Sequence, residues 1–347
     1  MFYSIFITHY RLIIKEFSIF LIAFFCVFHI KAQKTASSMN LNGNIRVMYT
    51  YSHLAEDIIV KDNILVSYQK KGKPIKHIDY IFDRKGFLLV ENKYNDEDIL
   101  DISSIYDYDE HGRIIEETLA EGGKYQLGRQ EYEYNKNGKQ SKLTVYDNKD
   151  SLKNRIFYNY DSLGNLSSEK AYNKIGGIIK EIYYQYDERG NQIFVDNRKT
   201  GIYSNKPYQE IMEFNNGNKL IYKSYTREDT LIWVYIAQYN KNDSLIYEEV
   251  KNGHGEITSY SSLEYKKDKR ISMKQYLKNR RVPITETYYK YDKQGKLITE
   301  EVYNANKKEL TKTRTYFYDE KQNWIYCIEH SKEGDYSIVY YRKINYF

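Results

Sequence analysis

The stretch YDYDEHGRI carries the clearest candidates for chemistry in this sequence. Asp107, Asp109 and His111 alternate up to Gly112, a pattern typical of the first half of an oxygen-rich calcium loop. Such a loop also needs a bidentate glutamate at its last position, where this sequence has Thr118. Because that ligand is missing, the role of the stretch has to be judged from the sequence around it.

The same stretch recurs along the chain at a nearly constant spacing. YIFDRKGF, YEYNKNGK, YNYDSLGN and YQYDERGN extend it into a series whose glycines lie 26 residues apart, at 86, 112, 138, 164 and 190. Later copies carry Asp243, Lys269, Gly295 or Gln322 at the glycine position. About ten such units cover residues 74–347, which predicts a repeat architecture.

Each unit has the pattern of one antiparallel hairpin. In YxYDxxG the two aromatic residues stand at i and i+2, and therefore on one face of a strand. The aspartate starts a type I turn and the glycine takes the left-handed position that ends it. An apolar residue two positions later begins the return strand, and a polar link leads to the next unit. The residues assigned to this structural repeat are Tyr106, Tyr108, Asp109, Gly112, Tyr132, Tyr134, Gly138, Tyr158, Tyr160, Asp161, Gly164, Tyr184, Tyr186, Asp187, Gly190, Tyr289, Tyr291, Asp292 and Gly295.

The repeat weakens the case for a metal at Asp107 and His111. Other units have residues such as Lys290 and Leu163 at these two positions, whereas a turn explains all units. Metal candidates remain in the acidic link NDEDILD, although it lacks a turn glycine and spaced ligands; they are Asp96, Asp98 and Asp101. The sequence has no HExxH, GxSxG or P-loop motif, so we expect neither an enzyme nor a cofactor.

The number of strands limits the shape of the sheet. Twenty strands about 4.8 Å apart would make a flat sheet about 95 Å wide, and open twisted sheets rarely exceed about ten strands. We therefore expect an all-β fold in which antiparallel hairpins form one long coiled or superhelical sheet with its tyrosines inward. The alternative is a closed large β-barrel. The charge on the face opposite the tyrosines disfavours a barrel in a membrane, although the terminal aromatic Phe347 is typical of one.

Residues 1–33 have the pattern of an export signal. Arg11 and Lys15 precede an apolar run of 14 residues, FSIFLIAFFCVFHI, which is shorter than the roughly 20 residues that span a membrane. We divide the chain into a signal peptide at 1–33, N-terminal capping strands at 34–73 and a repeat domain at 74–347.

Charge and cysteine content restrict the partners of the processed chain. Removal of residues 1–33 takes away three basic residues and one acidic residue, so the net charge falls from +6 to +4. A balance of this kind, without a basic stripe, does not indicate a nucleic-acid partner. Cys327 is then the single cysteine, and stability must come from packing instead of a disulfide.

The motif YxYDxxGN, found here as YNYDSLGN and YQYDERGN, resembles the YD repeats of Rhs-type proteins. The likeness extends from about residue 74 to about residue 325, with units longer than is usual in that family. It implies hairpins that wind into a hollow β-shell. The chain looks most similar to small exported YD-repeat-like proteins of Bacteroidetes.

These patterns together predict an exported, non-enzymatic repeat protein. We expect a structural or binding module at the cell envelope or outside the cell, located in the periplasm, at the outer-membrane surface or in the medium. A glycan or an envelope protein is the kind of partner that tyrosine rings and hydroxyls suit. A membrane is a partner only through an uncleaved signal or if the chain forms a membrane barrel. The alternative functions are an outer-membrane β-barrel and a shell-type component similar to Rhs proteins.

Overall fold

The computed structural model describes residues 34–62, 64–197, 209–215, 219–278 and 280–347. The predicted signal peptide lies outside these residues. They form a short 3-10 helix, η1 (Ser37–Met39), followed by one all-antiparallel sheet. No helix long and apolar enough to cross a membrane is found in the described part of the chain.

The strands alternate with tight turns along the whole described chain. Their bounds are β1 (Ile45–Lys61), β2 (Ile64–Phe82), β3 (Leu88–Tyr94), β4 (Leu100–Tyr108), β5 (Ile114–Glu121), β6 (Tyr125–Tyr134), β7 (Gln140–Tyr146), β8 (Leu152–Tyr160), β9 (Leu166–Asn173), β10 (Ile178–Tyr186), β11 (Gln192–Asp196), β12 (Gln209–Asn215), β13 (Lys219–Tyr225), β14 (Leu231–Tyr239), β15 (Leu245–Asn252), β16 (Ile257–Lys266), β17 (Lys269–Leu277), β18 (Thr285–Tyr291), β19 (Leu297–Asn304), β20 (Glu309–Tyr318), β21 (Trp324–Ser331) and β22 (Tyr336–Tyr346).

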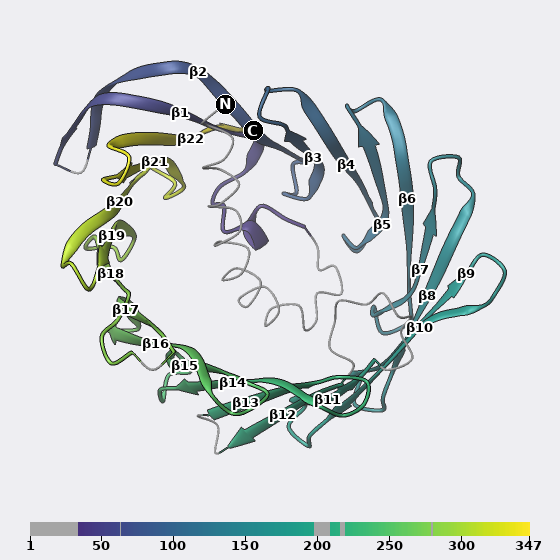
Figure 1. Ribbon diagram of the computed structural model, residues 1–347. Helices are drawn as coiled ribbons and strands as arrows, with labels where there is room; N and C mark the ends of the chain where they lie inside the picture. Colours follow the sequence, from purple (N-terminus) through teal and green to yellow (C-terminus); the bar gives the residue numbers. More distant parts are fainter. Residues whose placement is uncertain (1–33, 63, 198–208, 216–218, 279) are drawn as a thin grey trace.

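The sheet closes on itself. Each strand pairs with its neighbours in sequence, and β1 pairs with β22 from Ile45 opposite Tyr346 to Ala55 opposite Ser337. Figure 1 shows the resulting ring, with the purple and yellow ends of the chain side by side. The expected open, coiled sheet is therefore wrong, and the alternative of a closed large β-barrel is confirmed. Closure is favourable because an open sheet would leave two long strand edges with unpaired backbone groups.

The ring is wide. The 22 described strands, at about 4.8 Å each, give a circumference of roughly 106 Å and a diameter of roughly 34 Å before any strand tilt is added. Side chains fill the interior of a barrel of about eight strands, so the side chains of this much wider ring do not fill its interior. The inner wall is therefore a concave surface instead of a packed barrel core.

Residues 34–44, which precede β1 and which we call the inner segment, identify the inner wall. Figure 1 shows this purple segment, which includes η1, inside the ring. Ala36 and Leu41 of the segment form one buried cluster with Phe82, Leu88 and Tyr106 of β2 to β4. Those wall residues therefore face inward, and so do the side chains that alternate with them along the same strands.

A second cluster lies on the outside of the ring. Beyond Ala55, the far halves of β1 and β2 leave β22 and bend over the outer surface, as Figure 1 shows. We call this part, residues 55–70, the outer hairpin. Its buried cluster with β20, β21 and β22 contains Ala55, Ile58, Leu65, Tyr68, Phe317, Tyr326, Ile328 and Val339. The predicted N-terminal region 34–73 thus comprises the inner segment, β1 and about half of β2.

His53 lies at the base of the outer hairpin without a polar partner. Only 3% of it is exposed, and both ring nitrogens are buried with no hydrogen-bond partner. Its ring stacks on Tyr68 at 5.2 Å and meets the edge of Tyr341 at 5.4 Å. Burial first, and then the charge of Lys70, lowers the pKa of His53 below its ordinary value.

Acid is expected to destabilise the protein through this histidine. A lowered pKa means that the folded state favours neutral His53. The contribution of His53 to the free energy of unfolding is therefore fully present above about pH 6.5 and is lost as the pH falls below that value. Urea unfolding between pH 7.5 and pH 5 measures the loss. The half-buried His77, whose pKa burial also lowers, adds to the same slope. His53→Phe should make the dependence shallower, whereas His254→Gln, at an exposed turn, should not; equal slopes in the two variants would contradict this account.

Candidate functional site

Asp109 and Gly112 form the two ends of a tight turn. Asp109 Oδ1 accepts backbone N–H groups from His111 and Arg113, both at 2.9 Å, and the Gly112 N–H donates to the Asp109 carbonyl at 2.9 Å. Gly112 has a φ of 74°, a left-handed conformation that other L residues adopt at a cost. Burial raises the pKa of Asp109, but hydrogen bonds from Arg113 outweigh it and leave that pKa below its usual value.

The other aspartates assigned to the repeat make the same contacts. Each side chain accepts the backbone N–H four residues later: Asp161 from Asn165 (2.7 Å), Asp187 from Asn191 (2.8 Å) and Asp292 from Lys296 (2.7 Å). The glycines that end these three turns, Gly164, Gly190 and Gly295, have positive φ, and so does Gly138, which ends the turn that begins at Asn135. A carboxylate engaged by backbone donors in this way serves as a turn residue.

In six of the units the second tyrosine ties adjacent hairpins together. Its phenol donates to a backbone carbonyl at the start of the preceding return strand, 20 or 21 residues earlier. The pairs are Tyr108 to Leu88 (2.7 Å), Tyr134 to Ile114 (2.6 Å), Tyr160 to Gln140 (2.7 Å), Tyr186 to Leu166 (3.0 Å), Tyr291 to Arg270 (2.9 Å) and Tyr318 to Leu297 (2.7 Å). This contact gives the second tyrosine a structural role in the wall.

The first tyrosine meets carboxylates on the inner wall. Tyr132 donates to Glu117 at 3.0 Å, and Tyr184 donates to Glu169 at 2.8 Å. Burial, followed by the charge of Glu169, raises the pKa of Tyr184. Tyr158 and Tyr289 also have raised pKa values, chiefly through burial. The inner wall therefore presents neutral phenols next to carboxylates, a surface that offers both hydrogen-bond donors and acceptors.

The inner segment shows what this surface can hold. Lys34 Nζ donates to the Tyr106 hydroxyl at 2.5 Å and lies 3.5 Å from Glu91. The Ala36 N–H donates to the Gly86 carbonyl at 2.9 Å, and the Leu88 N–H donates to the Lys34 carbonyl at 2.8 Å. A piece of polypeptide thus binds the wall through its backbone and through one cation.

Two features of the turns were not predicted from the sequence. The polar links at the opposite end of the barrel use the same aspartate or asparagine turn; for example, Asn173 Oδ1 accepts the N–H groups of Ile175 (3.1 Å) and Gly177 (2.8 Å). Asparagine or aspartate followed by glycine three residues later was the available signal. Lys269 was wrongly aligned with the turn glycine, since the positive φ angles belong to Lys267 (49°) and Asp268 (61°).

The acidic link is also a turn. Asn95 Oδ1 accepts the N–H groups of Glu97 and Ile99, both at 3.0 Å, and Asp98 has the positive φ of the turn position, 65°. Asp98 Oδ2 lies 3.4 Å from Lys73 Nζ. The structure does not bring Asp96, Asp98 and Asp101 together, and no group of three metal-ligating side chains is found in the described residues.

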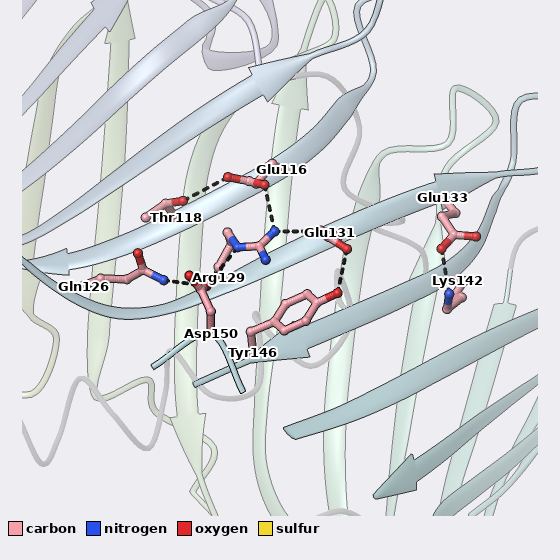
Figure 2. Close-up of polar contacts among 9 residues, drawn as sticks. All are labelled: Glu116, Thr118, Gln126, Arg129, Glu131, Glu133, Lys142, Tyr146 and Asp150. Atoms are coloured by element: carbon pink, nitrogen blue, oxygen red, sulfur yellow. Dashed lines mark hydrogen bonds and ion pairs between the residues drawn. The ribbon is translucent and has the colours of Figure 1, made fainter. Parts of the chain in front are cut away.

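The outer wall carries ion pairs along its strands. Figure 2 shows Arg129 between three carboxylates: its Nη1 lies 2.9 Å from Glu116 and also contacts Glu131, and its Nε lies 3.2 Å from Asp150. Hydrogen bonding to Glu131 is the largest cause that raises the pKa of Arg129. Further pairs on this face are Lys142 with Glu133 (2.7 Å), Lys251 with Glu249 (3.0 Å) and Lys170 with Glu181 (3.3 Å).

Substitution of Asp109 separates the turn from the metal interpretation. Asp109→Ala removes the acceptor of two backbone N–H groups and is expected to lower the free energy of unfolding by about 1–3 kcal/mol. Asp109→Asn keeps an acceptor oxygen and should lose less. Calcium should leave the melting temperature of the native protein unchanged. A calcium-dependent rise in melting temperature that Asp109→Asn abolishes would contradict the turn assignment.

One family model and several solved structures are similar to parts of this chain. A family model described as "Uncharacterised protein" matches residues 42–159, about a third of the chain. No curated protein matches. Among solved structures, the TcdB2–TccC3 complex is 11% identical over 76% of this chain and 20% of its own, with a TM-score of 0.30.

Two further structures have similar scores. A Tc holotoxin pore of Photorhabdus luminescens is 12% identical over 78% of this chain and 19% of its own, with a TM-score of 0.30. A porin-like protein from Bacteroides uniformis is 8% identical over 88% of this chain and 98% of its own, with a TM-score of 0.33. The chain spans about a fifth of the toxin chains it matches. Likenesses with TM-scores this low carry no argument about function.

Proposed function

We propose that this protein is an exported, non-enzymatic structural module whose closed β-shell stands in water and binds its partner on the inner wall. The observation that carries the proposal is the distribution of polarity across the wall. Ion pairs between strand residues, such as Arg129 with Glu116 and Lys170 with Glu181, occupy the outer face, where a membrane barrel needs an apolar band about 25 Å tall. A charge such as that of Arg129 on a lipid-facing strand costs about 2–4 kcal/mol at the bilayer midplane.

The inner wall supplies the binding surface in this proposal. The inner segment, with Lys34 on Tyr106 and Glu91, is an example of polypeptide held there. The resemblance of YNYDSLGN and YQYDERGN to the YD repeats of Rhs-type proteins supports a shell-type role. The residues of the repeat serve as wall and turn residues, and no catalytic role is assigned to them.

An outer-membrane barrel is the second candidate, favoured by the closed antiparallel sheet and by the export signal expected at residues 1–33. Fractionation of cells that express the full chain separates the two. Our proposal predicts recovery without detergent as a monodisperse protein from the periplasm or the medium. Recovery only from outer membranes with detergent, together with a folded form that resists sodium dodecyl sulfate, would overturn it in favour of the barrel in a membrane.

A further inference from the structure

Arg342 lies on the inner wall at the seam where the barrel closes. It stands on β22 opposite Thr50 of β1, two residues from Ile344, which is opposite Met48. Met48 and Ile344 belong to the cluster that packs against the inner segment. Since residues two apart on a strand share a face, the Arg342 side chain points to the interior of the ring, next to that segment.

The guanidinium of Arg342 has an aromatic neighbour and no acidic one in the described chain. Its Cζ lies 3.6 Å from the centroid of the Trp324 ring on β21. Its Nε is buried without a hydrogen-bond partner, and no described carboxylate lies within salt-bridge distance. By contrast, Arg314 on the same wall lies 2.7 Å from Glu329 and 3.3 Å from Glu300.

The charge of Arg342 is therefore poorly compensated. Burial lowers its pKa to about 10, and the nearby phenol of Tyr80 acts weakly in the opposite direction. A partly desolvated guanidinium without an acceptor has lost hydration that the protein does not replace. An incoming oxyanion would restore those interactions, because guanidinium and carboxylate fit each other through two parallel hydrogen bonds.

We propose that Arg342 anchors a carboxylate-binding site on the inner wall and that its ligand is an acidic sugar of the uronic acid class. A single guanidinium matches the single charge of a carboxylate, whereas a phosphate dianion would keep excess charge. The aromatic rings of Trp324 and Tyr80 and the hydroxyl of Thr50 are suited to the apolar face and hydroxyls of a sugar ring. This site specifies the ligand of the proposed binding surface. It rests on the proposed function in one respect, which is that water-soluble sugars must be able to enter the barrel.

Trp324 provides a direct readout of the site. The chain contains two tryptophans, so Trp233→Phe leaves Trp324 as the single indole. Titration of this variant with digalacturonic acid should give a saturable change in tryptophan emission with a millimolar or lower dissociation constant. The methyl diester of the same disaccharide, which has lost its charges, should give no saturable change. Inorganic phosphate serves as a second probe and should bind at least about tenfold more weakly.

Variants of Arg342 in the Trp233→Phe background test the anchor. Arg342→Gln should abolish the response, and Arg342→Lys, which keeps the charge but loses the planar fork, should weaken binding about tenfold or more. Circular dichroism and melting temperature check that each variant is folded. If Arg342→Gln does not fold, the comparison of the free acid with its methyl diester decides the matter without a variant.

Several outcomes would overturn the inference. These are the absence of a saturable response up to about 10 mM, an equal response to the diester, an equal response to phosphate, and a response that survives in folded Arg342→Gln. The same titration on protein extracted in detergent separates this inference from the proposed function. A response there would keep the site even if the shell proved to be a membrane barrel.

Discussion

Truncation of Phe82 to alanine is expected to lower the free energy of unfolding by about 3–5 kcal/mol. Phe82 is 2% exposed and joins the inner segment to the wall, in one cluster with Ala36, Ile45 and Met48. Removal of the ring leaves a cavity between the inner segment and the wall. The wall strands cannot move in to fill it, because their hydrogen-bond ladders hold them in place. Urea unfolding monitored by tryptophan fluorescence measures the change.

Phe157→Ala is the matched control for this substitution. Phe157 belongs to the same class of strand residue but is 38% exposed on the outer wall, with one edge-on contact to Tyr172 at 5.7 Å. Because the ring is only partly buried and makes one aromatic contact, Phe157→Ala should lower the free energy of unfolding by about 1 kcal/mol or less. Equal destabilisation by the two substitutions would show that the inner segment does not pack on the wall as described.

Deletion of residues 336–347 is expected to abolish cooperative unfolding and to produce aggregated protein. The deletion removes β22 and with it both of its ladders, so β1 and β21 become exposed edges. It also removes Val339, which is 0% exposed beneath the outer hairpin. Size-exclusion chromatography with light scattering and a urea titration measure the two effects.

A single substitution near the chain end serves as the control for the deletion. Phe347→Ala alters a residue that is 47% exposed and leaves the β1–β22 ladder in place. It should remain monomeric and unfold cooperatively. If the deletion variant were also monomeric with a sharp transition, the barrel would not need the seam, and the sheet would tolerate an open form.

Much of the local structure could be predicted from the sequence because it depends on neighbouring residues. The period of 26 residues, the two tyrosines on one face and the aspartate and glycine of each turn all act within one hairpin. The error at Lys269 has the same local origin. Between β16 and β17 a turn of two residues, Lys267 and Asp268, replaces the longer turn of the other units. The units had been aligned as if every turn had the same length.

The candidate site was predicted less well. Tyrosines on the inner wall were expected, but their partners were not. Glu117 and Glu169 accept hydrogen bonds from tyrosines that lie 15 residues away in the sequence, on a different strand. Arg342 and Trp324 were also missed. They stand 18 residues apart in the sequence and meet only because β21 and β22 are paired with a specific register.

The sequence by itself determined that this protein is a series of antiparallel hairpins with an aromatic face and a charged face. Closure was decided only by the tertiary structure. Whether a long sheet coils or closes depends on whether its first and last strands meet in register, and β1 and β22 are separated by nearly the whole chain. The outer hairpin and the inner segment depend on the same event, because each packs on a wall whose two faces become inside and outside only when the ring is complete.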